Sequence, residues 1–171
     1  MFDTLFDLPA HPLLIHAPIV LLPIAAIVTV GAAAKPDWRA RASWWILGGL
    51  FATLVLLFAA KESGEALIDA YDRANGEGAV DIEKHESLAE ATFVMTLIWT
   101  LVFAVLTVFE RVDRVRDGAL KPVATNAAVR RVLSFIAAAL GLLATVWLIR
   151  TGHEGARSVW GPRVDILFPE G

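Results

Sequence analysis

Four histidines are the residues of this chain best suited to do chemistry. His11 and His16 stand in the segment HPLLIHAP at the start of a long apolar stretch, His85 precedes another such stretch, and His153 follows a further one. Neutral imidazole is the commonest metal ligand in proteins. Two imidazoles from different helices can also hold a haem iron from opposite faces. The histidines therefore predict a ligand site, provided that the fold brings them together.

The segments that must position these histidines are apolar enough to lie in a membrane. Hydrophobic residues make up 57% of the 171 residues, and the mean hydropathy is positive. Four runs approach or exceed the roughly 20 helical residues that cross a bilayer: 13–34, 43–60, 91–109 and 132–149. Only helices and closed barrels satisfy their own backbone in lipid, and no run alternates as a barrel strand does. We predict an all-α integral membrane four-helix bundle that spans residues 1–171 as one domain.

The charges between these runs predict how the bundle is oriented. The connections 35–42 and 110–131 hold nine of the fifteen basic residues, and the positive-inside rule places both in the cytoplasm. Both termini and the acidic loop 61–90 then lie outside, an N-out, C-out arrangement in the cytoplasmic membrane. No linker or clear internal repeat divides the chain. Within the outer loop, we expect the second span to continue as a helix through KESGEALIDAYDR, and Asp81 to cap a helix that runs through IEKHESLAEATF.

In this orientation all four histidines lie at the outer end of the bundle. His11 precedes Pro12 and is expected at or just before a helix cap. His16 is one turn inside the span and is the ligand expected to be more deeply buried. We predict that His85 or His153 faces His16, whereas His11 starts a second site or only caps its helix. Gly64 and Gly155, which follow the second and fourth spans, allow close approach or a turn.

Two kinds of cofactor suit such a histidine set. Four ligands are enough for two bis-histidine haems. They also suit a copper or zinc site completed by carboxylates; the second-tier candidates are Glu62, Glu65, Glu86 and Glu154. The plainer interpretation is that a histidine at the membrane interface is only solvated or hydrogen-bonded, since polar groups are tolerated at helix ends.

Four short segments resemble one family. HPLLIHAP, SGEAL, KHESLAEATF and TGHEGARSVWG look like those of a bacterial family of small four-helix predicted membrane proteins, a domain of unknown function with an HPxxxHxP opening and a closing segment near TGHxGGxxVYxHG. The resemblance runs from Leu8 to about Val164. It implies the four-helix topology and histidines at positions 11, 16, 85 and 153, with a suggestion of haem binding and no established activity. The chain departs from the pattern at Trp160, and at Gly161 and Pro162, where the family has Tyr and a further histidine.

These observations favour one function over two alternatives. The first is a membrane-bound b-type haem protein that transfers electrons at the outer face, with quinone or a larger respiratory or photosynthetic complex as candidate partners. The others are a cofactor-free accessory subunit of such a complex and a copper- or zinc-binding membrane protein. The absence of cysteine excludes disulfides, thiolate metal sites and covalent c-type haem. No nucleophile elbow, HExxH or phosphate loop indicates a hydrolase, and no nucleic-acid partner is expected; whether the protein is an enzyme stays open.

Overall fold

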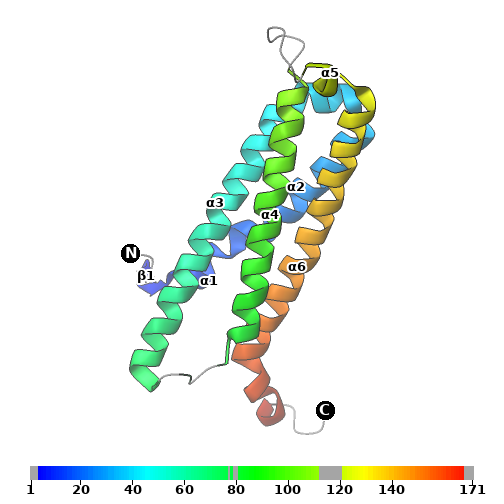
Figure 1. Ribbon diagram of the computed structural model, residues 1–171. Helices are drawn as coiled ribbons and strands as arrows, with labels where there is room; N and C mark the ends of the chain where they lie inside the picture. Colours follow the sequence, from blue (N-terminus) through cyan, green and yellow to red (C-terminus); the bar gives the residue numbers. More distant parts are fainter. Residues whose placement is uncertain (1–3, 77, 79–80, 112–120, 168–171) are drawn as a thin grey trace.

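The computed structural model describes residues 4–76, 78, 81–111 and 121–167, and most of these residues are helical (Figure 1). In chain order the elements are β1 (Thr4–Leu5), β2 (Leu8–Pro9), α1 (Ala10–Leu14), α2 (His16–Ala34), α3 (Pro36–Asn75), α4 (Glu83–Phe109), α5 (Lys121–Ala124) and α6 (Ala127–Leu167). The two strands form a small antiparallel hairpin directly before α1. The sequence did not predict this hairpin.

Four helical segments among these residues are long and apolar enough to cross a membrane, as predicted. They are Ala10–Ala34, which combines α1 and α2, and Pro36–Asn75, Glu83–Phe109 and Ala127–Gly161. The second span continues through the predicted extension, because α3 ends at Asn75. The third begins early, at Glu83; its N-cap residue is Ile82 and not the predicted Asp81, whose carboxylate accepts from the Glu83 backbone N–H over 3.3 Å. Both helical extensions beyond the apolar runs are therefore confirmed.

The hydrogen bonding of the first span is interrupted near its beginning. α1 ends at Leu14, and α2 starts afresh at His16 after the single residue Ile15. Pro18 accounts for the break, since a proline lacks the N–H for a helical bond and its ring clashes with the carbonyl four residues earlier, here that of Leu14. Ile15 keeps α-helical dihedral angles (φ −64°, ψ −22°), and its N–H donates to the His11 carbonyl over 3.1 Å, so the helical turn continues through this interruption.

The four long helices form a bundle in which each helix has two main neighbours. α2 packs against α3 and α6, and α4 packs against the same two helices; α1 leans on α3. Figure 1 shows both described chain ends in the half of the bundle that holds the α3–α4 connection, whereas the α2–α3 connection and α5 lie at the opposite end. Two helical hairpins, α2–α3 and α4–α6, thus run in the same direction through the bundle.

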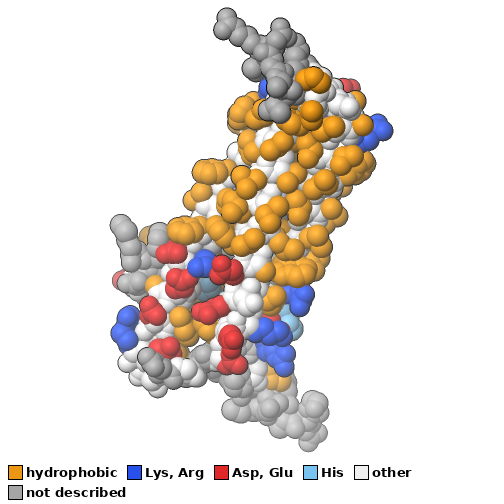
Figure 2. Space-filling view, in the orientation of Figure 1, with side chains coloured by type: hydrophobic (Ala, Val, Ile, Leu, Met, Phe, Trp, Pro, Cys, Tyr) orange, Lys and Arg blue, Asp and Glu red, His pale blue; other side chains and the backbone are white. Residues whose placement is uncertain are grey.

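The interior of the bundle consists mostly of small and hydroxyl-bearing side chains, together with a few large ones. Trp99, Phe103 and Leu106 on α4 meet Leu22 and Leu50 in the core. Most other buried positions carry Ala, Thr or Ser, which allow membrane helices to approach closely. Figure 2 shows the large apolar side chains turned outward as a broad hydrophobic band, with charged side chains gathered beyond one end of it. This distribution suits a bundle surrounded by lipid.

Close packing at Trp99 leads to a first prediction. The indole ring is fully buried, and a Cβ added at Gly141 on α6 would lie 2.7 Å from it. We expect Gly141→Ala to destabilise the protein, because overpacking costs about 1–3 kcal/mol, more than the roughly 1 kcal/mol that Ala gains over Gly in a helix. Thermal unfolding in detergent measures the change. Gly48→Ala is the control, since nothing lies within 4 Å of its added Cβ; equal melting temperatures for the two variants would contradict the prediction.

Candidate functional site

Two of the four histidines meet at the end of the bundle that holds the α3–α4 connection. The ring centroids of His11 on α1 and His85 on α4 are 6.4 Å apart, and the ring planes are perpendicular, at 88°. Both residues are half-buried. We call these two residues the histidine pair.

The His11 ring lies against α3. Its Nδ1–H donates to the backbone carbonyl of Ala60 over 2.8 Å, and the Ser63 hydroxyl lies 3.3 Å from the same nitrogen. A Cβ at Gly64 would be only 3.1 Å from two atoms of this ring. Glycine at position 64 therefore permits the ring to rest directly on the helix, which confirms the predicted close approach.

The His85 ring makes the same contacts with α6. Its Nδ1–H donates to the backbone carbonyl of Thr151 over 2.9 Å, and a Cβ at Gly155 would be 2.8 Å from the ring. The side chain of Thr151 also bonds that of Thr92, with 3.0 Å between the two hydroxyl oxygens. α4 and α6 are thus joined immediately beside His85, and close approach at Gly155 is confirmed as well.

These contacts determine which nitrogen of each ring is available to a ligand. A carbonyl oxygen only accepts hydrogen bonds, so Nδ1 carries the proton in both rings and Nε2 of the neutral imidazole carries the lone pair. No described residue forms a hydrogen bond with either Nε2. Metal-binding histidines generally have this arrangement, with one nitrogen held by a carbonyl or carboxylate and the other on the metal.

The other two histidines do not join the pair. His16 at the start of α2 and His153 on α6 are both exposed. The expectation that His16 is the more deeply buried ligand is wrong. His11 and His16 are five residues apart, about 140° around a helix, so His11 meets α3 while His16 lies on an exposed face.

The second-tier glutamates are also separate from the histidine pair. Glu65 is exposed and accepts a hydrogen bond from Lys61 over 2.6 Å. Glu154 pairs with Lys84 over 2.5 Å and joins α4 to α6. Glu62 is half-buried and Glu86 is exposed. Within the described residues, no three His, Cys, Asp or Glu side chains are grouped so that they could hold a metal ion.

Comparison with known families covers almost the whole of this architecture. The model of the family described as predicted membrane protein (DUF2231) matches residues 7–167. The chain belongs to this family. Searches of curated proteins and of solved structures find no match.

Membership in DUF2231 confirms the resemblance in the sequence and the assignment as a membrane protein. The match extends from the strand hairpin to the last residue of α6 and so includes all four histidines. The family description names no cofactor, reaction or partner, so the function has to be argued from the site.

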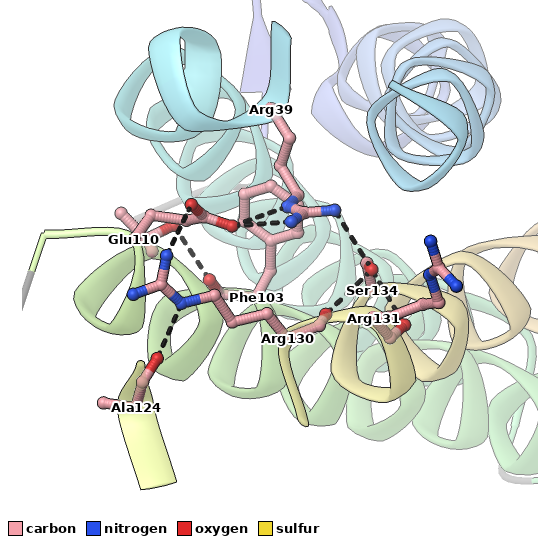
Figure 3. Close-up of polar contacts among 8 residues, drawn as sticks. Arg39, Phe103, Glu110, Ala124, Arg130, Arg131 and Ser134 are labelled. Atoms are coloured by element: carbon pink, nitrogen blue, oxygen red, sulfur yellow. Dashed lines mark hydrogen bonds and ion pairs between the residues drawn. The ribbon is translucent and has the colours of Figure 1, made fainter. Parts of the chain in front are cut away.

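A buried ionic cluster at the opposite end of this DUF2231 protein was missed by the sequence analysis. Glu110, at the end of α4, lies between two arginines that come from the first turns of α3 and α6 (Figure 3). Arg39 donates to one carboxylate oxygen from Nε and Nη2 over 2.8 and 2.7 Å, and Arg130 Nη1 lies 3.5 Å from the other oxygen. Arg39 also donates to the Ser134 hydroxyl over 3.2 Å. We call Arg39, Glu110 and Arg130 the arginine cluster.

One signal in the sequence could have revealed the arginine cluster. Arg39 and Glu110 were counted only as loop charges that orient the bundle. Yet Arg39 is four residues before Ser43 and seven before Ile46, and these three positions share the buried face of α3. A charge in phase with the buried face of a membrane helix is costly unless it is paired, so a partner for Arg39 could have been sought.

Proposed function

We propose that this protein binds a b-type haem through His11 and His85 and transfers electrons through it. The observation that carries the proposal is the matched state of the two rings, each with Nδ1 bound to a backbone carbonyl and Nε2 left with its lone pair. Two imidazoles on different helices, each held in this way, suit a metal that binds one nitrogen from each ring.

The separation of the rings supports a single metal between them. With metal–nitrogen bonds of about 2.0–2.1 Å, two imidazoles on opposite sides of one metal have ring centroids roughly 6 Å apart. The observed distance of 6.4 Å between the ring centroids agrees with this spacing. Two ligands of a tetrahedral metal would bring the rings closer together.

The number of protein ligands favours haem over a bare metal ion. A structural zinc site takes four protein ligands and a catalytic one takes three, but the described residues provide no group of three candidate ligands. Haem supplies four nitrogens of its own and needs only two axial ligands from the protein. The two histidines fit that requirement, so haem is preferred to copper or zinc.

Each part of the site has a distinct task in this proposal. His11 and His85 would bind the iron through Nε2, and the carbonyls of Ala60 and Thr151 would hold the rings in place. When bound, the iron would cycle between ferric and ferrous states, at a potential that its ligands and surroundings set. Because the arginine cluster lies at the other end, the positive-inside rule supports an extracytoplasmic haem, close to a quinone or a membrane-complex partner.

The absorption spectrum of the detergent-purified protein tests this proposal directly. We expect a Soret band that shifts on reduction with dithionite, about one iron per chain, and a low-spin ferric signal in electron paramagnetic resonance, as two imidazole ligands produce. Elemental analysis separates the alternatives. Copper or zinc without iron would replace haem by a metal site, and colourless protein free of metal after expression with ample haem would favour the accessory subunit.

A further inference from the structure

We infer that the chain consists of two copies of one helical hairpin, and that His11 and His85 are equivalent ligands, one from each copy, on an approximate two-fold axis between them. The first copy is α1, α2 and α3, and the second is α4 and α6. The repeat is argued from contacts and burial alone. Its consequence for the ligand rests on the proposed haem function.

The contacts of the two histidines are the first evidence for the repeat. Each ring lies at the start of the first helix of its hairpin and contacts the second helix of the same hairpin. In both cases Nδ1–H donates to a carbonyl located four residues before the glycine on which the ring rests: Ala60 before Gly64, and Thr151 before Gly155. The same two ring atoms, Cε1 and Nδ1, approach the glycine most closely in both copies.

The buried positions of the first helices coincide when the histidines are aligned. Moving α2 along the chain by the 74 positions that separate His11 from His85 puts every buried residue of α2 on a buried residue of α4. The pairs are Pro18 and Thr92, Leu22 and Thr96, Ala26 and Thr100, Thr29 and Phe103, Ala32 and Leu106, and Ala33 and Thr107. The two helices therefore have the same rotation relative to the core.

The second helices are aligned by their glycines, independently of the histidines. Shifting α3 by the 91 positions that separate Gly64 from Gly155 again matches buried residues. The pairs are Ser43 and Ser134, Ile46 and Ala137, Leu50 and Gly141, Thr53 and Ala144, and Ala60 and Thr151. The shared rotation thus holds for both helices of the hairpin.

The glycine alignment also predicts a contact at the far end of the bundle. It places Arg39 on Arg130, and these two arginines bind opposite oxygens of the single Glu110 carboxylate. Two buried helices share a phase by chance in about one case in four, since an α-helix has 3.6 residues per turn. A common phase therefore proves little alone. The glycine that receives the histidine and the arginine that binds Glu110 are 25 positions apart on both α3 and α6, and this repeated pair of contacts is not explained by phase.

The repeat singles out the histidine pair from the other histidines. In the same alignments His16 corresponds to Glu90, and His153 corresponds to Glu62. Only His11 and His85 are equivalent to each other. The approximate axis therefore runs from the centre of the histidine pair towards Glu110, which both copies share.

A ligand on this axis has to present similar groups in two opposite directions. A planar tetrapyrrole with a central metal meets the condition, because its two axial positions are alike. Gly64 and Gly155 are then equivalent positioning residues, since an added Cβ at either one would displace the ring that ligates the metal.

Paired glycine variants of the full-length protein test the inference with two readouts. In cofactor-free protein labelled with ¹⁵N-histidine, we expect two of the four side chains to show the Nδ1–H tautomer by nuclear magnetic resonance. Gly64→Ala should perturb only the His11 signal, and Gly155→Ala only the His85 signal. In haem-loaded protein, each variant should weaken haem binding by about 10–100-fold, as loss of a residue that orients a metal ligand does, and by the same factor within about threefold.

Gly152→Ala is the matched control, because nothing lies within 4 Å of its added Cβ; it should change neither readout. The repeat is overturned if only one of the two rings shows the Nδ1–H tautomer, or if one glycine variant weakens haem binding and the other does not. Matching tautomers in a protein that binds no haem would instead overturn the haem proposal and leave the repeat supported.

Discussion

The His85→Ala protein, purified in detergent, is expected to contain no stoichiometric haem and to lack the Soret band of the wild type. His85 would supply one of the two nitrogens on the iron, and its ring is already oriented by the Thr151 carbonyl. No other described histidine is close enough to replace it, since His16 and His153 are exposed and stand apart from the pair. His11→Ala should have the same effect. Pyridine haemochrome and iron analysis measure the content.

The exposed histidines provide matched controls for this prediction. His16→Ala and His153→Ala remove the same side chain from the same end of the bundle, and both should retain full haem content and the wild-type reduced-minus-oxidised spectrum. Circular dichroism and gel filtration verify that each variant remains helical and monodisperse. Loss of haem from the His16 variant, with retention in the His85 variant, would rule out the histidine pair as the axial ligands.

The Glu110→Gln protein is expected to lose about 3–5 kcal/mol of unfolding free energy, the usual cost of removing one partner from a buried ion pair. The Glu110 side chain is only 5% exposed, and that of Arg39 only 6%. Glutamine preserves the shape of the side chain but removes its charge, so two guanidinium groups would face each other without a carboxylate between them. Three helices meet at this contact, hence unfolding should remain cooperative while its midpoint falls.

Denaturation in mixed detergent micelles, followed by circular dichroism, measures the effect of Glu110→Gln. Glu65→Gln is the control, because its partner Lys61 is on the same helix and the Lys61 and Glu65 side chains are 33% and 53% exposed. Such an exposed pair contributes about 0.5 kcal/mol or less. If the two variants were equally stable, the arginine cluster would not contribute to holding the helices together.

The sequence alone determined the class of this protein and the approximate positions of its four spans, although α6 continues to Leu167, well past the predicted end at residue 149. A helix satisfies its backbone hydrogen bonds in lipid without help from other segments, so the apolar run 91–109 predicts a span whatever its neighbours are. Local signals added the extensions: the polar continuation to Asn75 and the start of α4 next to Asp81. The sequence predicted four histidines as site residues; the structure brings His11 and His85 together, and the pairing expected for His16 was not found.

Contacts across helices could not be read from the sequence in the same way. Hydropathy determines that a segment crosses the membrane but leaves its rotation about its own axis undetermined. The positions of His11 and His85 depend on which neighbouring helix offers each ring a glycine. Arg39 and Glu110 are 71 residues apart, and nothing local links them.

The sequence analysis did not detect the repeat for a related reason. Its two copies share burial and contacts, but most of the matched positions differ in residue type, as Leu22 with Thr96 and Thr29 with Phe103 illustrate. Composition and hydropathy thus determined four apolar helices with histidines near their ends. Only the tertiary structure decided which rings meet, because that depends on how the helices rotate and pack against one another, and packing is a property of pairs of helices rather than of any single segment.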